Sequence, residues 1–210
     1  MKENTCRVCK KQFVEPSMVL VGFKDCCNKC RPDQTLLKMN DSELRDALTT
    51  CGVDPQFSEL NDSLYKARAL KISKEALYGN TPLFLEGTIA TGKSLTLSCL
   101  AKDLILRGTS VRYFNVGRLA VKCRSDNAYM DRLTPVLQKT RHVFFDDMGA
   151  IYDKTGWFSC WLLSIMDYRY SNKKPMSGSC NNPDCVEARC MRRIMEQARC
   201  IEFTVIEESK

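Results

Sequence analysis

The chain has 210 residues, enough for one sizeable domain and a small second one, and its composition is that of an ordinary globular protein. No apolar run approaches the roughly 20 residues that cross a bilayer, and the N-terminal residues lack the apolar core of a signal peptide. We therefore expect a cytoplasmic protein with no membrane partner, whose 13 cysteines are metal ligands or buried side chains rather than disulfides. The net charge of +7 favours an anionic partner.

The first element is a pair of C-x-x-C motifs separated by 17 residues. Two thiolates three residues apart on a tight turn can reach one tetrahedral ion, and a second such turn completes its coordination shell. A segment of about 30 residues does not form a stable core alone, so we expect a zinc-binding domain over residues 1–34 that folds around its metal. Cys26 adjoins Cys27 and is an alternative fourth ligand. The expected Zn²⁺ ligands are Cys6, Cys9, Cys27 and Cys30.

A polar stretch over residues 31–56 has helical periodicity, with Asp41 or Ser42 as the expected N-cap. A glycine and a proline then interrupt the pattern. We therefore expect a helical linker over residues 35–58 that leads into a larger domain. Residues 60–77 have apolar side chains near helical spacing, and we expect this helix to pack against a sheet.

The central motif is a match to G-x-x-x-x-G-K-[ST], the glycine-rich loop that cradles phosphates. Residues 82–86 before it have the pattern of a buried strand, and residues 95–107 after it have apolar side chains at helical spacing. Backbone N–H groups in such a turn, with the positive end of the following helix, bind phosphate oxygens. We expect Lys93 to reach the β- and γ-phosphates of ATP and Ser94 to hold Mg²⁺. The expected nucleotide-binding residues are Gly87, Thr88, Ile89, Ala90, Thr91, Gly92, Lys93, Ser94 and Leu95.

Next in the chain, residues 110–116 are predicted to form a strand and residues 117–137 a helix. The predicted helix has several cations, which either neutralise nucleic-acid phosphates or form a solvated face, and the sequence favours neither. These cations are Arg118, Lys122, Arg124 and Arg132.

Two adjacent carboxylates follow an apolar run that begins at His142. In open α/β sheets, ligands bind beyond the carboxyl ends of the strands, where Asp146 and Asp147 would emerge. We expect Asp146 to bind Mg²⁺, mostly through water, and Asp147 to orient or deprotonate the attacking water. A strand of this kind some 50 residues after a phosphate-binding loop is typical of an ATPase. His142 lies at the start of the strand, and we expect it to be structural.

The remaining elements alternate between helix and strand. An apolar helix is predicted over residues 155–170, and a strand over residues 176–181 ends in Asn181, beside the predicted site. A basic helix over residues 185–197 and a last strand over residues 200–206 complete the pattern, which indicates an α/β fold with a parallel sheet.

These motifs, taken in order, resemble the DnaC-type helicase loaders of the AAA+ superfamily, a group close to the IstB transposition ATPases. The similarity covers roughly residues 48–203 and includes the phosphate-binding loop, the paired aspartates and the segment 161–175. It also includes residues 179–181, Ser-Cys-Asn, where the family has Thr-Ser-Asn, and residues 189–194, where the family has two arginines four residues apart.

The resemblance implies an AAA+ P-loop ATPase domain, with a parallel sheet flanked by helices, over residues 59–210. On the family's pattern, Asn181 is similar to the sensor-1 residue that detects the γ-phosphate. Arg189 or Arg193 is similar to the arginine finger that one subunit offers to its neighbour's ATP. The cysteine-rich N-terminus resembles the zinc-bearing domain by which some loaders bind the replicative helicase, and the compact size implies a phage-encoded or mobile-element version.

Two departures from the family pattern imply looser phosphate binding and a slow, switch-like ATPase, respectively. Thr88, Ile89 and Ala90 lack the usual proline and extra glycine of the loop, and no arginine follows residue 206 where loaders often have a sensor-2 motif. The leading hypothesis is an ATP-dependent loader that self-associates with ATP, binds single-stranded DNA and delivers a replicative helicase. The alternatives are an IstB-like transposition ATPase acting on duplex DNA, and a helicase-binding adaptor or inhibitor with little ATPase activity.

Overall fold

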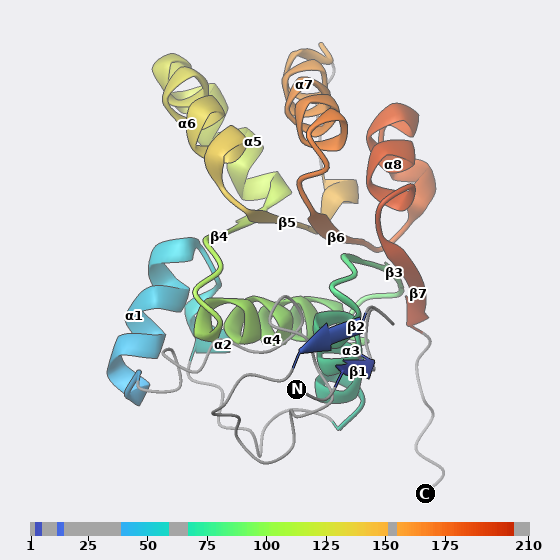
Figure 1. Ribbon diagram of the computed structural model, residues 1–210. Coiled ribbons are helices and arrows are strands. Elements are labelled where there is room, and N and C mark those ends of the chain that lie inside the picture. The colour runs from blue at the N-terminus through green and yellow to red at the C-terminus, as the bar shows by residue number, and fades with distance from the viewer. Residues whose placement is uncertain (1–2, 6–11, 15–38, 59–66, 151–154, 204–210) are drawn as a thin grey trace, which may run out of the picture.

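A computed structural model gives the architecture of the chain (Figure 1). The residues that it describes are 3–5, 12–14, 39–58, 67–150 and 155–203. The expected zinc ligands Cys6, Cys9, Cys27 and Cys30 therefore lie outside the described residues. Near the N-terminus, β1 (Glu3–Thr5) and β2 (Gln12–Val14) pair in the antiparallel sense.

A five-stranded sheet forms the centre of the larger domain, with the strand order β4-β5-β6-β3-β7. All four neighbouring pairs are parallel, which confirms the predicted α/β fold with a parallel sheet. The strands are β3 (Leu83–Gly87), β4 (Val111–Asn115), β5 (His142–Asp146), β6 (Met176–Cys180) and β7 (Arg199–Phe203). In a parallel sheet all the carboxyl ends lie at one edge, so the loops after β3, β5 and β6 meet there.

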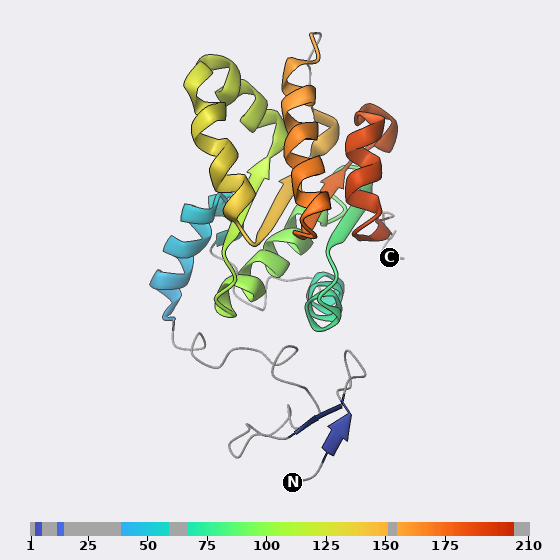
Figure 2. The ribbon, with the colours of Figure 1, turned by 45° about the horizontal axis from the view of Figure 1, so that its top comes forward.

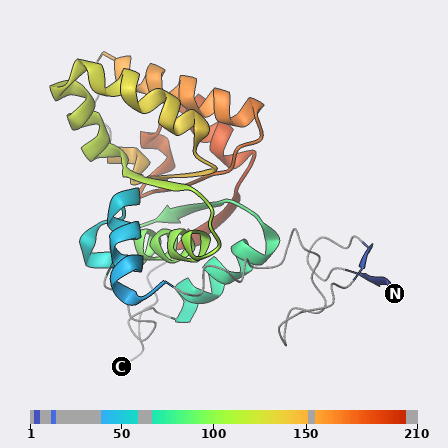
Figure 3. The ribbon, with the colours of Figure 1, turned by 60° about the vertical axis from the view of Figure 1, so that its left-hand side comes forward.

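Helices cover both faces of this sheet, as Figures 1 and 3 show. One face is covered by α1 (Asp41–Cys51), α2 (Pro55–Ser58), α3 (Ala67–Gly79) and α4 (Lys93–Leu106). The other face is covered by α5 (Val116–Ser125), α6 (Asn127–Lys139), α7 (Trp157–Ser171) and α8 (Ala188–Met195), which lie side by side in Figure 2. Two short 3₁₀ turns, η3 (Met148–Ala150) and η4 (Pro183–Cys185), follow β5 and β6.

The core has two halves because successive side chains of a strand point to opposite faces of the sheet. On β3, Leu83 and Leu85 pack towards α4, whereas Phe84 packs towards the α7–α8 side. On β5, Phe144 belongs to the first half and Phe145 to the second. Both faces of these strands are buried, which explains why their sequences are continuous apolar runs rather than alternating ones.

The single helix predicted over residues 117–137 is wrong, because the structure has two helices there. Asp126 has extended backbone angles, which end α5, and its side chain accepts a hydrogen bond from the N–H of Ala128, which caps α6. Aspartate favours such caps over helix interiors because its short side chain bonds to nearby backbone N–H groups. The cations of this stretch are thus distributed over two helices.

The predicted N-cap of α1 is also wrong, because Asn40 occupies that position instead of Asp41 or Ser42. Asn40 and Glu43 form a capping box, in which each side chain accepts a hydrogen bond from the other's backbone N–H at 2.9 Å. Further along, Leu48 and Cys51 are buried against α4 and β4. The helix expected to be a linker therefore contributes to the core of the larger domain. None of the helices in the described part of the chain has the length and apolar character needed to cross a membrane.

Candidate nucleotide-binding site

The loop between β3 and α4 has backbone angles that favour glycine. Gly87 has a φ of 136°, and a Cβ atom there would lie 2.0 Å from the main-chain oxygen of Phe203 on β7. Gly92, the residue before α4, has a φ of 95°. Both glycines are therefore favoured by their positive φ, and at Gly87 the close approach of β7 also excludes a side chain.

Lys93 is the first residue of α4, and only 6% of its surface is exposed. Its Nζ donates hydrogen bonds to the main-chain oxygens of Gly87 and Thr88, at 2.7 and 2.6 Å. Desolvation lowers the pKa of Lys93, while nearby acidic groups, including Asp146 and Asp147, act in the opposite direction. A partly desolvated ammonium group inside a ring of backbone polar groups fits an anionic ligand such as a phosphate.

Asp146 ends β5, and its carboxylate is buried among hydroxyl groups. Ser94 Oγ donates to Asp146 Oδ1 at 3.1 Å, and Ser179 Oγ donates to the same oxygen. Tyr113 donates to the other oxygen, Oδ2, at 2.9 Å. The two residues expected to hold Mg²⁺, Ser94 and Asp146, are therefore in direct contact. A hydroxyl and a carboxylate are hard oxygen ligands, so this pair fits Mg²⁺.

Asp147 has a φ of 57°, in the left-handed region that few residues other than glycine adopt. Its backbone N–H donates to Ser179 Oγ at 3.0 Å, and Asn181 Nδ2 donates to its Oδ1 at 3.3 Å. Burial, followed by the neighbouring Asp146, raises the pKa of Asp147. A carboxylate whose pKa is raised in this way is a better proton acceptor than an exposed one.

A cavity of about 420 Å³ lies between these residues at the carboxyl edge of the sheet. Its walls include most of the predicted loop, the second carboxylate and the amide that follows β6. Sequence reasoning missed Phe57 and Asn115 as parts of the wall. The lining consists of Phe57, Ile89, Ala90, Thr91, Gly92, Lys93, Ser94, Leu95, Asn115, Asp147, Ser179 and Asn181.

The two predicted finger arginines lie elsewhere, on α8. Arg189 is exposed and pairs with Glu187 at 3.4 Å. Arg193 Nε donates to the carboxylate of Asp167 on α7, and its guanidinium lies 4.7 Å from the centre of the Tyr170 ring. Among the described residues that line the 420 Å³ cavity, none comes from α8. The structure thus separates these arginines from the nucleotide-binding residues of the same chain.

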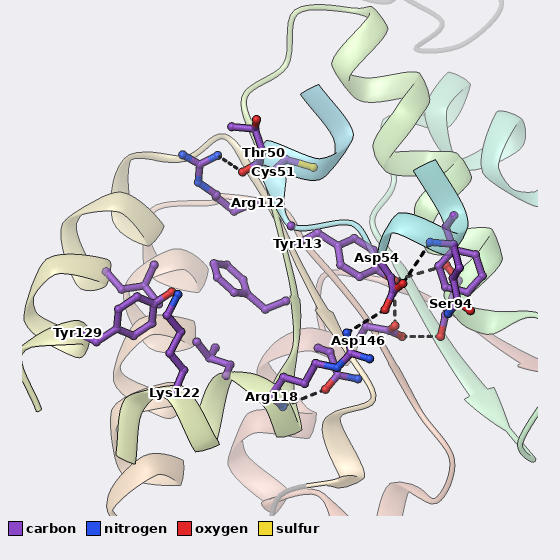
Figure 4. Close-up of a pocket in the computed structure, with 17 residues that line it drawn as sticks. Thr50, Cys51, Asp54, Ser94, Arg112, Tyr113, Arg118, Lys122, Tyr129 and Asp146 are labelled. Carbon is purple, nitrogen blue, oxygen red and sulfur yellow. Dashed lines mark hydrogen bonds and ion pairs between the residues drawn. The ribbon is translucent and has the colours of Figure 1, made fainter. Parts of the chain in front are cut away.

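A second cavity, of about 550 Å³, lies beside the first, between α1–α2 and α5–α6, and we call it the α5 groove (Figure 4). Arg112, Arg118 and Lys122 line it. Arg118 forms an ion pair with Asp54 at 2.8 Å, and the ammonium of Lys122 lies 4.5 Å from the centre of the Tyr129 ring. The residues that line both cavities are Phe57, Ser94 and Asn115.

The cations predicted for this region are divided by the structure. Arg118 and Lys122 line the α5 groove, whereas Arg124 and Arg132 do not. Arg132 pairs with Asp126 at the junction of α5 and α6. Within the described residues, no group of three or more His, Cys, Asp or Glu side chains is arranged to hold a metal ion.

The fold is similar to that of several solved replication proteins. A structure of DnaI gives a TM-score of 0.58 at 20% identity, over 76% of this chain and 94% of that one. The DnaC helicase loader gives a TM-score of 0.60 at 16% identity, over 72% and 100%. The replication initiator DnaA, bound to AMPPCP and single-stranded DNA, gives 0.57 at 17% identity, over 74% and 52%. No family model and no curated protein matches the chain, and at these identities the likeness shows a shared fold.

Proposed function

We propose that this chain is an ATPase that loads a replicative DNA helicase. The observation that carries the proposal is the convergence of Lys93, Ser94, Asp146, Asp147 and Asn181 at one edge of a sheet whose fold is shared with DnaC and DnaI. One of the structural neighbours, DnaA, was solved with AMPPCP and single-stranded DNA, which supports a nucleotide and a DNA strand as ligands of this fold.

In the proposed mechanism, Lys93 exchanges its two loop carbonyls for the β- and γ-phosphates of ATP. Ser94 and Asp146 hold Mg²⁺, which when bound neutralises charge on the phosphates. Asp147 orients the attacking water and accepts its proton. Asn181 would detect the γ-phosphate, a role supported by its contact with Asp147, because one amide can bond to both groups.

We further propose that ATP-bound subunits associate and that α8 provides the arginine finger. The arginines of α8 do not line the 420 Å³ cavity of their own chain. We therefore propose that they contact the ATP of a neighbouring subunit. Arg189 and Arg193 lie one helical turn apart on α8, which allows both to face the same neighbour. Either one would stabilise the charge that develops in the transition state.

The α5 groove is our proposed path for single-stranded DNA. Three cations line it, and the rings of Tyr129 and Phe114 are also part of the wall. Cations neutralise phosphates while aromatic rings stack on bases, and together they bind single strands with little sequence preference. Arg118 and Lys122 already have partners in the chain, so DNA binding would exchange those contacts for phosphates.

The proposed helicase-binding element is the zinc domain that the N-terminal cysteines predict. Cys6 and Cys9 fall in the connection between β1 and β2, and the pairing of Thr5 with Gln12 brings the two ends of that connection together.

A capture experiment tests the function directly. The tagged full-length chain is incubated with bacterial lysate, with Mg·ATP or without nucleotide, and bound proteins are identified by mass spectrometry. We expect a hexameric replicative helicase, retained more strongly with Mg·ATP. Capture of a recombinase would favour the transposition alternative. Capture of a helicase by a chain that does not hydrolyse ATP, with or without DNA, would favour an adaptor or inhibitor.

The matched control removes the predicted zinc ligands. Replacing Cys9 and Cys30 by Ser should release one Zn²⁺ per chain, as measured by elemental analysis, and abolish helicase capture while ATP binding persists. The exposed Cys160→Ser variant serves as a thiol control with no expected effect. Full zinc retention in the double variant would show that the cysteine assignment is wrong.

A further inference from the structure

Tyr113 connects β4 to the carboxylate at the end of β5. In the parallel register, Tyr113 lies opposite Phe144, and Asn115 lies opposite Asp146. Because alternate residues of a strand share a face, Phe144 and Asp146 project from the same side of the sheet as Tyr113. The Tyr113 ring stacks on Phe144 with centroids 5.6 Å apart, and this places its hydroxyl at Asp146 (Figure 4).

The donors to Asp146 are divided between its two oxygens. Ser94 and Ser179 donate to Oδ1, while Tyr113 donates to Oδ2 at 2.9 Å. Donors on both sides oppose rotation of the carboxylate about its Cβ–Cγ bond. The tyrosine hydroxyl is also 3.4 Å from the main-chain oxygen of Ser94, so it lies against the first turn of α4 as well.

Packing alone does not explain the hydroxyl. Only 3% of the Tyr113 surface is exposed, and its ring belongs to the apolar cluster between the sheet and α4, where phenylalanine would fit equally well. A buried hydroxyl is stabilised only when it has a partner, and the partner here is the carboxylate.

We propose that Tyr113 is a positioning residue. Its hydroxyl fixes the carboxylate of Asp146 beside the hydroxyl of Ser94, so that the two side chains are held ready to bind magnesium. The inference rests on the proposed ATPase function. Tyr113 itself touches neither phosphate nor metal in this proposal. It acts by keeping the two expected magnesium ligands, one from α4 and one from β5, at a constant separation.

The test is the Tyr113→Phe variant, because it removes the hydroxyl and keeps the ring. Affinity for a fluorescent ATP analogue is measured in Mg²⁺ and in EDTA, and hydrolysis is measured separately. We expect the variant to bind the analogue as tightly as the parent in EDTA. The gain in affinity that Mg²⁺ provides should be about three- to tenfold smaller than in the parent, and kcat should be about tenfold lower. Tyr168→Phe, which removes the hydroxyl of an exposed tyrosine on α7, should match the parent.

A double-mutant cycle separates positioning from a general loss of structure. If Tyr113 acts through Asp146, Tyr113→Phe should have no further effect on Mg²⁺ dependence in an Asp146→Ala background. Thermal unfolding of each variant checks the fold. The proposal would be overturned if Tyr113→Phe alone had the Mg²⁺ dependence and the kcat of the parent. It would also be overturned if Tyr113→Phe lowered the Mg²⁺-dependent affinity equally with and without Asp146→Ala. If the parent itself showed no Mg²⁺-dependent nucleotide binding, the proposed function would fail first, and the two failures are thus distinguishable.

Discussion

The nucleotide-binding edge of the sheet and the surface of α8 both carry charged residues, but these residues differ in how deeply they are buried. Lys93 and Asp146 are 6% and 5% exposed, and their partners come from the loop, α4, β4 and β6. The side chains of Arg189 and Arg193 are 75% and 33% exposed, and their acidic partners are on α7 or are the cap residues at the two ends of α8. The first group is buried, whereas the second is partly or largely exposed.

This difference suggests how the two regions divide their tasks. Buried charges with several hydrogen bonds are difficult to rearrange, because any lost bond leaves a desolvated group without a partner. Exposed ion pairs contribute little and can be exchanged for other contacts. Under the proposed mechanism, the buried strand ends suit a preorganised site for magnesium and phosphate, and the exposed arginines of α8 suit contact with a neighbouring subunit.

The largest effect is expected from the finger arginine. Under the proposed mechanism, Arg193→Ala or Arg189→Ala keeps the ATP affinity of the parent but loses hydrolysis by roughly a thousandfold, together with ATP-dependent self-association. Hydrolysis and sedimentation with and without ATP provide the measurements. Arg192→Ala is the matched control, because Arg192 is an arginine of the same helix that is not proposed as a finger.

A mixture of two variant proteins tests whether the two regions act together across a subunit interface. A finger variant combined with Lys93→Ala should recover some activity, because each subunit then supplies the half that the other lacks. Hydrolysis that does not depend on protein concentration, and that is unchanged in Arg189→Ala and Arg193→Ala alike, would contradict a shared site. The α8 arginines would then be surface ion pairs only.

A smaller effect is expected at the nucleotide-binding edge, from Asp147→Asn. The amide keeps the shape of the carboxylate and loses the proton acceptor, so hydrolysis should fall by about a hundredfold. ATP affinity should change little, since the contacts of Lys93 and Ser94 remain. Lys93→Ala provides the opposite pattern, a loss of affinity of about a hundredfold, because it removes the buried cation. If Asp147→Asn also lost nucleotide affinity, its role would be structural.

The parts of the site that were predictable from the sequence depend on local patterns. The glycine-rich loop, Asp146 and Asn181 each come at the carboxyl end of a predicted strand, and parallel strands bring these ends to one edge of the sheet. Tyr113 and Ser179 were not identified as partners of Asp146. Their contacts depend on β4 and β6 being the two neighbours of β5, and strand order is a property of the whole fold.

Arg169 is another residue whose contacts could not be predicted from the sequence. It is completely buried in α7, and its guanidinium donates to the main-chain oxygens of Leu137, Thr140, Arg141 and Pro175. Arginine is rarely buried, so a sequence pattern alone places it at the surface. Here it satisfies carbonyl groups at the ends of α6 and before β6, which only the packed helices bring together.

The smallest effect is expected from weakening the ion pair between Arg193 and Asp167 of the same chain. Its guanidinium donates to Asp167 and lies over the Tyr170 ring, and a salt bridge to Glu196 adds a longer contact of 3.8 Å. If Arg193 is the finger, these contacts compete with the neighbour's nucleotide. Asp167→Asn should therefore increase ATP-dependent self-association, and hydrolysis at low protein concentration, by about two- to fivefold.

The size of this effect distinguishes the two arginines. Asp167 contacts Arg193 in the structure, whereas the acidic partner of Arg189 is Glu187, so Glu187→Gln is the matched variant for the alternative finger. Glu187 also caps α8 through the N–H of Cys190, and glutamine preserves an acceptor for that bond. A gain with Asp167→Asn alone would assign the finger to Arg193, and a gain with Glu187→Gln alone would assign it to Arg189. A loss of association with Asp167→Asn would mean that the ion pair presents Arg193 to the neighbour, and the proposed exchange of partners would be wrong.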